Sequence, residues 1–341
     1  MRHAYGSRIR LQWPWAVPVL AVFAALAMIA CADASDEVRI PSEASCDAPR
    51  THDGGTFRDE TIQTADGRTR QYILHVPPAY GDGSQRLPLV VNLHGFALTD
   101  DLYFDYTGLH AKADEAGFIL LTPEGASTET TEQHHWNTSG PTATEPDDTA
   151  FLSALLDHAE SSLCVDSDRV YFAGYSNGAR MSVQLACDLA DRIAAIALVS
   201  GVASPACDSA RPMPLIAFHG TEDGLIPLDG GDNGEHVVEE IIPAWAEHNG
   251  CATTNDEQPL TGTTGVRLLR NSECDDDSTI DLYVVFDADP NAAGDQGGGH
   301  TWPDATLGEP TDAGNTTTRE INANDLIWDF FTAHPNTSGD E

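Results

Sequence analysis

Apolar residues along the chain form two kinds of pattern, which alternate from about residue 69 to residue 333. Short, nearly continuous apolar runs such as 87–93 are typical of strands buried on both faces of a parallel sheet. Stretches such as 147–163 carry apolar residues every three to four positions and predict amphipathic helices. The predicted strands are 69–76, 87–93, 118–122, 170–175, 193–199, 214–218 and 279–286, and the predicted helices are 108–116, 147–163, 181–189, 237–248 and 319–333.

This alternation predicts an α/β fold, a doubly wound and mostly parallel sheet with right-handed crossovers and helices on both faces. The chain has 341 residues, 41% of them hydrophobic, which is enough for a full core. We expect one catalytic domain over 56–335, preceded by a polar tether at 32–55 and followed by a polar tail at 336–341. The long polar stretches are expected to frame an active-site rim, and they are 126–148, 231–235 and 287–318.

The first residues, 1–31, have the composition of a secretory signal. Arginines precede an apolar run at 15–30, which is shorter than the about 20 residues that a membrane span needs. Small residues suited to signal cleavage lie within 30–34. Residues 28–31 also resemble a bacterial lipobox, which would place a lipid on Cys31. We therefore expect export, with the protein either freely secreted or held at the cell envelope through Cys31.

Export places the cysteines in an oxidising compartment, where disulfides persist. Apart from Cys31, six of the seven cysteines remain, an even set that sequence alone cannot pair uniquely. Proximity along the chain favours Cys187–Cys207 and Cys251–Cys274, which leaves Cys46–Cys164 to fix the N-terminal arm. No C-x-x-C spacing occurs, so we expect no zinc site and no other metal.

The formal net charge is −37, from 54 acidic and 17 basic residues, and Lys112 is the only lysine. Such a surface repels nucleic acid and anionic membranes. We expect neither as a partner, apart from a membrane reached through a lipid on Cys31. The acidic excess also suits a salty habitat, where counterions screen self-repulsion. Optimal activity and stability in salt-free buffer would contradict that hypothesis.

Gly174-Tyr175-Ser176-Asn177-Gly178 joins a predicted strand to a predicted helix and fits the pattern G-x-S-x-G, the nucleophile elbow of α/β-hydrolases. A serine on so sharp a turn has a strained backbone, and the residues two positions away must have almost no side chain. The pentapeptide alone is a weak signal. The strand before it and the helix after it supply the context that makes Ser176 the predicted nucleophile.

A serine hydroxyl is a poor nucleophile near pH 7 and needs a base that a carboxylate orients. In α/β-hydrolases the chain order is serine, acid, histidine. Asp223 lies in the turn after strand 214–218 and is the predicted acid, with neighbouring Glu222 as the alternative. His300 follows three glycines, which let its loop approach another backbone closely, and it is the predicted base.

The tetrahedral intermediate of acyl transfer needs two donors for its oxyanion. The backbone N–H of Asn177 is one, and that of Phe96, at the end of an early buried strand, is expected to be the other. Of the remaining histidines, we expect His94 to make structural hydrogen bonds, His134 and His135 to line the rim or face solvent, and His219 to pack behind Asp223.

With these residues placed, the chain resembles the secreted esterases of the polyhydroxybutyrate depolymerase-like and feruloyl esterase-like type. The likeness runs from about residue 69 to residue 335. The segments that carry it are 93–96 (LHGF), 122–125 (TPEG), 136–137 (WN), 147–148 (DD), 168–171 (DRVY), 174–178 (GYSNG), 185–187 (LAC), 190–194 (ADRIA), 219–223 (HGTED), 249–251 (NGC) and 298–303 (GGHTWP).

The resemblance implies an α/β-hydrolase fold with Ser176 as nucleophile, Asp223 as acid and His300 as base. It also supports the pairs Cys187–Cys207 and Cys251–Cys274. Many members have a further glycine soon after His-Gly, where this chain has 96–98 (FAL). That departure is expected to narrow the acyl pocket, which bears on substrate preference and leaves the reaction type unchanged.

We therefore predict a secreted carboxylic-ester hydrolase that works through an acyl-enzyme without a cofactor. Polyhydroxyalkanoate oligomers and feruloyl- or acetyl-type esters are the expected substrates. Trp136 and Trp302 are candidates for contacting the acyl group, or else core residues. The alternatives are a serine peptidase or acyltransferase on the same fold, and a non-catalytic binding protein with an inactive triad. The oligomeric state stays open.

Overall fold

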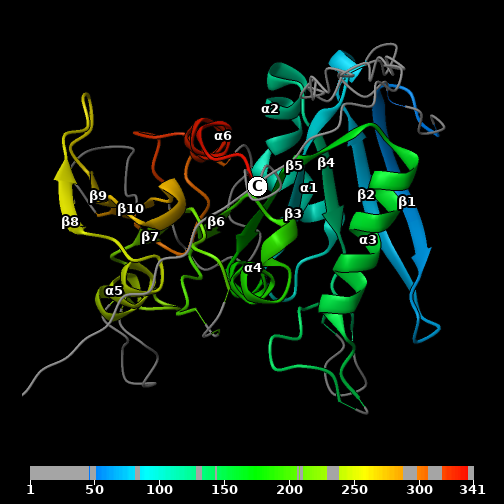
Figure 1. The fold of residues 1–341 in the computed structure, drawn as a ribbon, viewed down its shortest axis with the longest axis horizontal. Coiled ribbons are helices and arrows are strands. Elements are labelled where there is room, and N and C mark those ends of the chain that lie inside the picture. The colour runs from blue at the N-terminus through cyan, green and yellow to red at the C-terminus, as the bar shows by residue number, and fades with distance from the viewer. Residues whose placement is uncertain are drawn as a thin grey trace, which may run out of the picture. The chain divides into compact units, whose positions relative to one another are not determined.

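The computed structural model describes most of the predicted catalytic domain, residues 56–335 (Figure 1). The described residues are 46, 51–80, 85–127, 133–142, 144–205, 207, 210–228, 238–286, 298–305 and 317–336. The predicted signal 1–31 with Cys31, most of the tether 32–55 and the loop 231–235 lie outside these residues. The described residues all belong to one compact unit that begins at Ser45.

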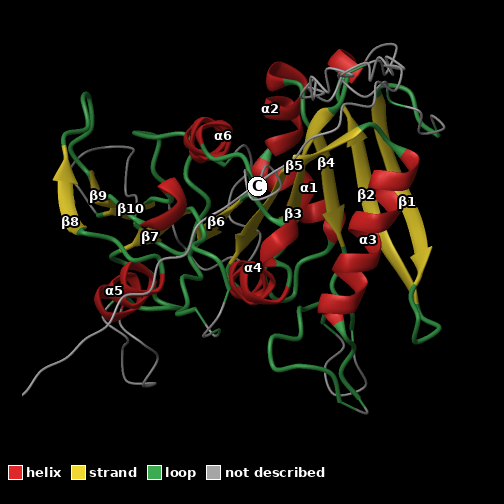
Figure 2. Cartoon of the chain, viewed as in Figure 1, coloured by secondary structure: helices red, strands yellow, loops and turns green. Residues whose placement is uncertain are grey.

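One mixed sheet forms the centre of this unit, in the order β1-β2-β4-β3-β5-β6-β7-β10-β9-β8 (Figure 2). The central strands β4, β3, β5, β6, β7 and β10 pair in parallel. Strands β1 and β2 at one edge, and β9 and β8 at the other, pair antiparallel. The strands are β1 Gly55–Gln63, β2 Thr69–Val76, β3 Leu87–Leu93, β4 Ile119–Pro123, β5 Val165–Tyr175, β6 Ala195–Val199, β7 Leu215–Gly220, β8 Thr253–Gln258, β9 Val266–Ser272 and β10 Ile280–Val285.

Helices cover both faces of the sheet, as predicted (Figure 1). One apolar cluster joins the sheet to α3, α4 and α5, and a second joins the opposite face to α1, α2 and α6. The helices are α1 Asp100–Thr107, α2 Leu109–Ala116, α3 Asp148–Ser162, α4 Asn177–Asp188, α5 Val238–His248 and α6 Ala323–Ala333, with short 3-10 turns at Pro78–Tyr80, Ala190–Arg192 and Asp275–Asp277.

The central strands follow directly from their sequences. Within β5, Phe172 packs into the first cluster, whereas Tyr171 and Ala173 pack into the second. All three are fully buried, because successive side chains of a strand point to opposite faces and helices cover both. The continuous apolar runs of the sequence therefore mark the middle of the sheet, and β3 has its predicted bounds.

The edge strands β1, β8 and β9 and the helix α1 were not predicted. Strand β8 has the sequence TTNDEQ and is mostly exposed, so no apolar alternation marks it. Helix α1 carries three aromatic residues within about one turn, Tyr103, Phe104 and Tyr106, a composition closer to that of strands. Its start is instead fixed by Thr99, whose side chain accepts a hydrogen bond from the Leu102 N–H.

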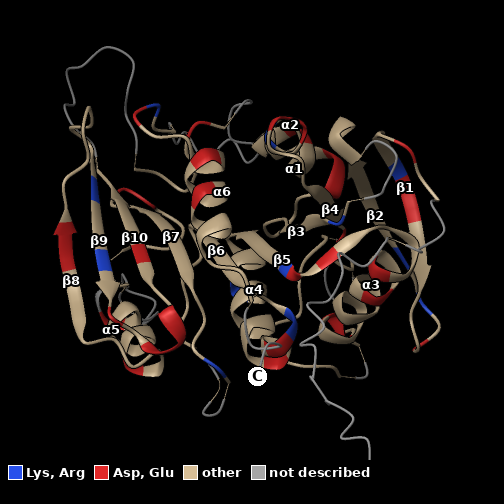
Figure 3. Ribbon diagram, turned by 45° about the horizontal axis from the view of Figure 1, so that its top comes forward, with Lys and Arg blue, Asp and Glu red and all other residues tan. Residues whose placement is uncertain are grey.

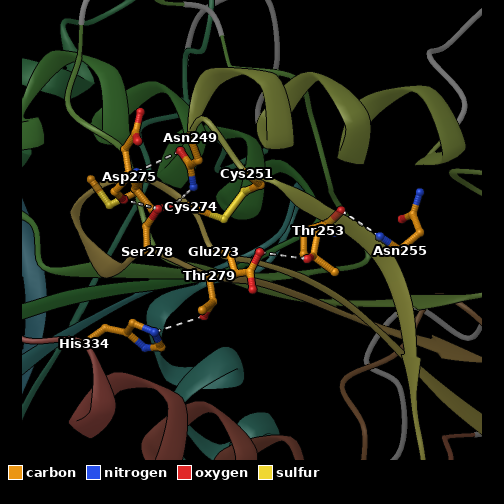
Figure 4. The surroundings of a disulfide bond; sticks show 12 residues. Asn249, Cys251, Thr253, Asn255, Glu273, Cys274, Asp275, Ser278, Thr279 and His334 are labelled. Carbon is orange, nitrogen blue, oxygen red and sulfur yellow. Dashed lines mark hydrogen bonds between the residues drawn. A yellow bond between two sulfur atoms is a disulfide. The ribbon is translucent and has the colours of Figure 1, made fainter.

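The structure contains the three expected disulfides, Cys46–Cys164, Cys187–Cys207 and Cys251–Cys274. Figure 4 shows the last, which joins the end of α5 to the end of β9. Beside it the Asp275 N–H donates to the Asn249 carbonyl at 2.8 Å. Disulfides at these positions are typical of proteins that fold in an oxidising compartment.

Acidic residues are spread over strands β1 and β8 and helices α2, α3 and α6 (Figure 3). Few basic residues are present to pair with them, since the chain has 17 Lys and Arg against 54 Asp and Glu. Among the described helices none is both long and apolar enough to cross a lipid bilayer.

Candidate active site

Ser176 lies at the junction of β5 and α4, with a backbone φ of 54° and ψ of −115°. This conformation costs free energy for a residue with a side chain and persists only where the surroundings hold it. Its N–H donates to the Val199 carbonyl at the end of β6, at 2.8 Å. The strained turn lifts Ser176 above the carboxyl edge of the sheet, where parallel strands place ligand-binding residues.

The two glycines of the elbow are needed for close approach. A Cβ on Gly174 would lie 2.3 Å from the Gly178 carbonyl oxygen, and one on Gly178 would lie 2.1 Å from the Leu93 carbonyl oxygen. Both distances are far below van der Waals contact. The G-x-S-x-G spacing therefore reflects the packing of the elbow against the end of β3, as expected from the sequence.

Asp223 and His300, which are 77 residues apart, are joined by a hydrogen bond of 2.7 Å between Oδ2 and Nδ1. Both side chains are buried. The other carboxylate oxygen of Asp223 accepts two backbone N–H groups, from Leu225 at 3.0 Å and from Ile226 at 2.8 Å. The carboxylate is therefore fixed in one orientation and presents a single oxygen to the imidazole.

Glycines bring the His300 loop onto the end of β7. A Cβ on Gly220 would lie 1.9 Å from the Gly298 carbonyl oxygen, and the Glu222 N–H donates to that same oxygen at 2.7 Å. The run of glycines before His300 thus serves the close backbone approach that the sequence indicated. The Glu222 side chain is exposed, so Asp223 is the carboxylate that the structure places against His300.

Tyr175 connects the nucleophile turn to the base. Its hydroxyl donates to the His300 carbonyl at 2.6 Å, and its ring lies 5.0 Å from the imidazole, centre to centre. Because Tyr175 precedes Ser176 in the chain, the elbow and the His300 loop are held to each other. No role was predicted for Tyr175, because the motif G-x-S-x-G allows any residue before the serine.

The turn after β3 lies directly against the elbow. A Cβ on Gly95 would be 2.9 Å from the Tyr175 ring and 3.3 Å from the Ser176 Cβ. Ala97 adopts a left-handed φ of 67° and donates its N–H to the His134 carbonyl at 2.8 Å. The Phe96 N–H has no acceptor among the described residues. The predicted role of this N–H as an oxyanion donor requires such an unpaired group.

The His94 side chain holds this turn in place. Its Nδ1 donates to the Gly95 carbonyl at 2.7 Å, and its Nε2 accepts the Gly125 N–H at 2.8 Å. Complete burial lowers the pKa of the imidazole from 6.5 to about 4, so the ring is neutral near pH 7. The expectation of a structural role for His94 matches these contacts.

The second expected oxyanion donor, the N–H of Asn177, lies in the first turn of α4, where backbone N–H groups lack intrahelical acceptors. The Asn177 side chain has a further role that the sequence did not reveal. Its Oδ1 accepts the Trp136 N–H at 2.7 Å and its Nδ2 donates to the Trp136 carbonyl at 3.0 Å. These bonds tie the start of α4 to the loop that follows β4.

Trp136 and Trp302 are core residues, and their assignment as substrate contacts is wrong. Trp136 is 1% exposed and donates its Nε1–H to the His94 carbonyl at 3.0 Å. Trp302 is 0% exposed and donates its Nε1–H to Asn324 Oδ1 at 3.0 Å. With their ring faces packed and their polar atoms paired, both stabilise the loops around the site.

The other histidines take the places expected for them. His219 packs behind Asp223, with Nε2 bonded to the Ile226 carbonyl at 2.8 Å, and burial lowers the pKa of its ring. His134 and His135 are partly exposed and lie near Glu124 and Glu145. Beside them the Phe96 side chain is 47% exposed, and its ring centre is 5.9 Å from that of His135.

Burial of neutral His94 predicts a loss of stability in acid. The unfolded chain takes up this proton near pH 6.5 and the folded protein only near pH 4. Stability therefore falls as the pH decreases through that window, by about 3 kcal/mol from this residue. Urea unfolding of wild type and His94→Gln at about pH 7 and pH 4 measures this loss of unfolding free energy. Equal pH-dependent losses in the two proteins would contradict the prediction.

Known proteins related in sequence are esterases. The chain is 28% identical over 278 residues to the probable feruloyl esterase C of Aspergillus terreus, which covers 80% of this chain and 86% of that protein. It is 29% identical over 272 residues to the feruloyl esterase C of Emericella nidulans, covering 77% and 84%. Residues 70–223 match the sequence profile of the family Esterase PHB depolymerase. Over this region the chain is similar to that family, and the related proteins support an ester hydrolase.

A solved structure of similar fold is the acetyl xylan esterase from Aspergillus awamori, with a TM-score of 0.56 at 15% identity. The similarity covers 82% of this esterase and 99% of that chain. It confirms the predicted α/β-hydrolase fold. The family match includes Ser176 and Asp223 and ends before His300, which the structure brings to Asp223.

Proposed function

We propose that this esterase hydrolyses carboxylic esters through an acyl-enzyme formed on Ser176. The observation that carries the proposal is the buried 2.7 Å hydrogen bond between Asp223 and His300. Since the Asp223 carboxylate only accepts, the His300 Nδ1 carries a proton and its Nε2 is left as the basic nitrogen. The bond from the Tyr175 hydroxyl to the His300 carbonyl supports a place for this histidine near the neighbouring Ser176.

In the first half-reaction the Ser176 Oγ attacks the ester carbonyl carbon while His300 Nε2 takes the hydroxyl proton. The resulting imidazolium is stabilised by Asp223, and the oxyanion is bound by the N–H groups of Phe96 and Asn177. As the intermediate collapses, the C–O bond to the alcohol breaks and His300 gives its proton to the departing oxygen. In the second half-reaction, water attacks the acyl-enzyme in the same way and releases the acid.

The candidate substrates are feruloyl- or acetyl-type esters and polyhydroxyalkanoate oligomers. Feruloyl esterases and an acetyl xylan esterase are among the proteins similar to this chain, and the family profile that it matches is Esterase PHB depolymerase. Three disulfides and the basic, apolar N-terminal segment support a secreted protein that acts outside the cell.

Partitioning of the acyl-enzyme tests this proposal. Esters that share one acyl group but differ in leaving group, such as phenyl acetate and p-nitrophenyl acetate, form the same intermediate. With added methanol, the ratio of methyl acetate to acetic acid is therefore expected to be identical for both. A ratio that depends on the leaving group would contradict a common acyl-enzyme. Acetanilide, the matching amide, is expected to react far more slowly, which separates an esterase from a peptidase.

A further inference from the structure

The turn that carries the Phe96 N–H, residues 94–98, is neither helical nor extended. It joins the end of β3 to the start of α1. Ala97 within it has a left-handed φ of 67°, which costs free energy for a residue with a side chain. A bond of 3.2 Å from the Leu98 N–H to the Gly95 carbonyl closes the turn. The position of the Phe96 N–H therefore depends on the neighbours that hold this turn from outside.

Two histidines from different segments hold the turn. His134 does so through its backbone, because its carbonyl accepts the Ala97 N–H at 2.8 Å. His94 does so through its side chain, which bonds to the Gly95 carbonyl at 2.7 Å. A strained residue such as Ala97 persists only where its surroundings fix it. The bond to His134 acts directly on that residue, the next one in the chain after the oxyanion donor.

The His134 side chain fixes its own backbone in turn. The imidazole Nδ1 lies 2.9 Å from the Gly125 carbonyl oxygen and 3.4 Å from Glu124 Oε2. A carbonyl oxygen and a carboxylate only accept hydrogen bonds, so Nδ1 carries the proton that lies toward both. The His134 side chain is 31% exposed and that of Glu124 18%, so water screens the contact only in part. The imidazole is thus tied to segment 124–125.

The backbones of the two segments also meet. The His135 N–H donates to the Ala126 carbonyl at 3.2 Å, and a Cβ on Gly125 would lie 2.4 Å from the His135 carbonyl oxygen. Gly125 bonds to both histidines that hold the turn: its N–H donates to His94 Nε2 at 2.8 Å, and its carbonyl accepts from His134. The turn, the two histidines and this glycine therefore form one closed set of hydrogen bonds.

Glu124 connects this set to helix α1. The Asp100 N–H, in the first turn of α1, bonds to the Glu124 carboxylate, and negative charge is favourable at a helix N-terminus. The Glu124 backbone is fixed as well, since its N–H donates to the Gln71 carbonyl and its own carbonyl accepts from Arg70, both at 3.0 Å. Burial and then the Asp100 carboxylate raise the pKa of Glu124, and the contact with His134 opposes that rise.

We propose that His134 is a positioning residue for the oxyanion hole: together with Glu124 it holds Ala97, and so it places the Phe96 N–H for the oxyanion. This inference rests on the proposed function, because it takes Phe96 as a donor to the intermediate formed on Ser176. His134 acts through the turn and needs no contact with the ester. Since the oxyanion carries full charge only in the transition state and intermediate, loss of this support lowers kcat more than it weakens substrate binding.

Two substitutions of His134 test the proposal. His134→Leu keeps most of the bulk and removes the donor, whereas His134→Asn keeps an N–H at the same place, because the Asn Nδ2 is attached to Cγ as the His Nδ1 is. His134→Leu is expected to lower kcat for p-nitrophenyl acetate by about tenfold to a hundredfold, with KM within about threefold of wild type. His134→Asn is expected to restore kcat to within about threefold of wild type.

A thiono ester separates the oxyanion hole from the triad. In p-nitrophenyl thionoacetate C=S replaces C=O, so attack by Ser176 places the negative charge on sulfur, a larger atom and a weaker hydrogen-bond acceptor than oxygen. The N–H groups of the hole then contribute little to the rate, while Ser176 and His300 act as before. His134→Leu is expected to lower kcat/KM for this ester by less than about threefold.

His158→Leu is the matched control, since it makes the same change at an exposed histidine of α3. It is expected to hydrolyse both esters as wild type does. An equal loss on the two esters in His134→Leu would place the defect in the triad or the fold and would overturn the proposal. So would a kcat of His134→Asn as low as that of His134→Leu.

Amide hydrogen exchange tests the same contact without catalysis, and it decides the matter if wild type hydrolyses neither ester. The Ala97 amide is expected to be protected in wild type and to exchange about tenfold faster in His134→Leu. That result would support placement of the turn by His134 even if the proposed function failed. An Ala97 amide that exchanges in wild type as fast as in an unstructured peptide would overturn the proposal, whether or not the leucine variant folds.

Discussion

Replacement of Ser176 by alanine is expected to lower kcat by about a million-fold while leaving KM within a few-fold of wild type. The substitution removes the Oγ that forms the acyl-enzyme, and all covalent steps depend on it. The oxyanion donors and the pockets remain, so the variant should still bind ester and accelerate hydrolysis slightly over water. Steady-state hydrolysis of a p-nitrophenyl ester measures the loss.

Ser182→Ala is the matched control for this variant. Ser182 lies on the same helix, is fully buried, and donates its hydroxyl to the Gly178 carbonyl at 3.1 Å. Its loss is expected to cost about 1 kcal/mol of stability and little activity. A Ser176→Ala variant that keeps more than about one hundredth of wild-type kcat would rule out Ser176 as the nucleophile.

Replacement of Asp223 by asparagine is expected to lower kcat by about ten-thousand-fold. The Asn carbonyl oxygen would keep the hydrogen bonds from Leu225 and Ile226, because those backbone groups only donate. The amide nitrogen would then face His300 Nδ1 and donate to it. This reverses the tautomer: the proton of His300 moves to Nε2, which can no longer take the proton of Ser176.

Glu222→Gln is the control for Asp223→Asn. It changes the neighbouring carboxylate, which is exposed and was the alternative acid from the sequence. Its kcat is expected to stay within about twofold of wild type, and thermal unfolding of both variants shows whether the fold survives. A large loss of kcat in Glu222→Gln with a small one in Asp223→Asn would reverse the assignment.

The parts of the fold that could be predicted from the sequence are those whose side chains are mostly buried. Strand β3 is apolar at nearly every position because helices cover both faces of the sheet there, and its bounds were predicted correctly. Strand β8 is polar and lies at an edge, held by backbone hydrogen bonds to β9 that any sequence can make. Composition carries no signal for such a strand.

The parts of the candidate site that could be predicted are those that a short sequence motif encodes. Gly174 and Gly178 mark a close approach of two backbones, which a sequence records as missing side chains. The environment of Trp136 depends on the His94 carbonyl, 42 residues away, and no local pattern indicates that contact. From the sequence alone, a tryptophan near the site could therefore be either a ligand contact or a core residue.

Covalent labelling tests most directly whether Ser176 is activated by His300. After treatment with an alkyl fluorophosphonate, we expect one adduct per chain, located by peptide mapping on Ser176. The adduct should be absent in Ser176→Ala and should form far more slowly in His300→Gln. Labelling at another residue, or labelling of Ser176 that is equally fast without His300, would contradict a nucleophile activated by this histidine.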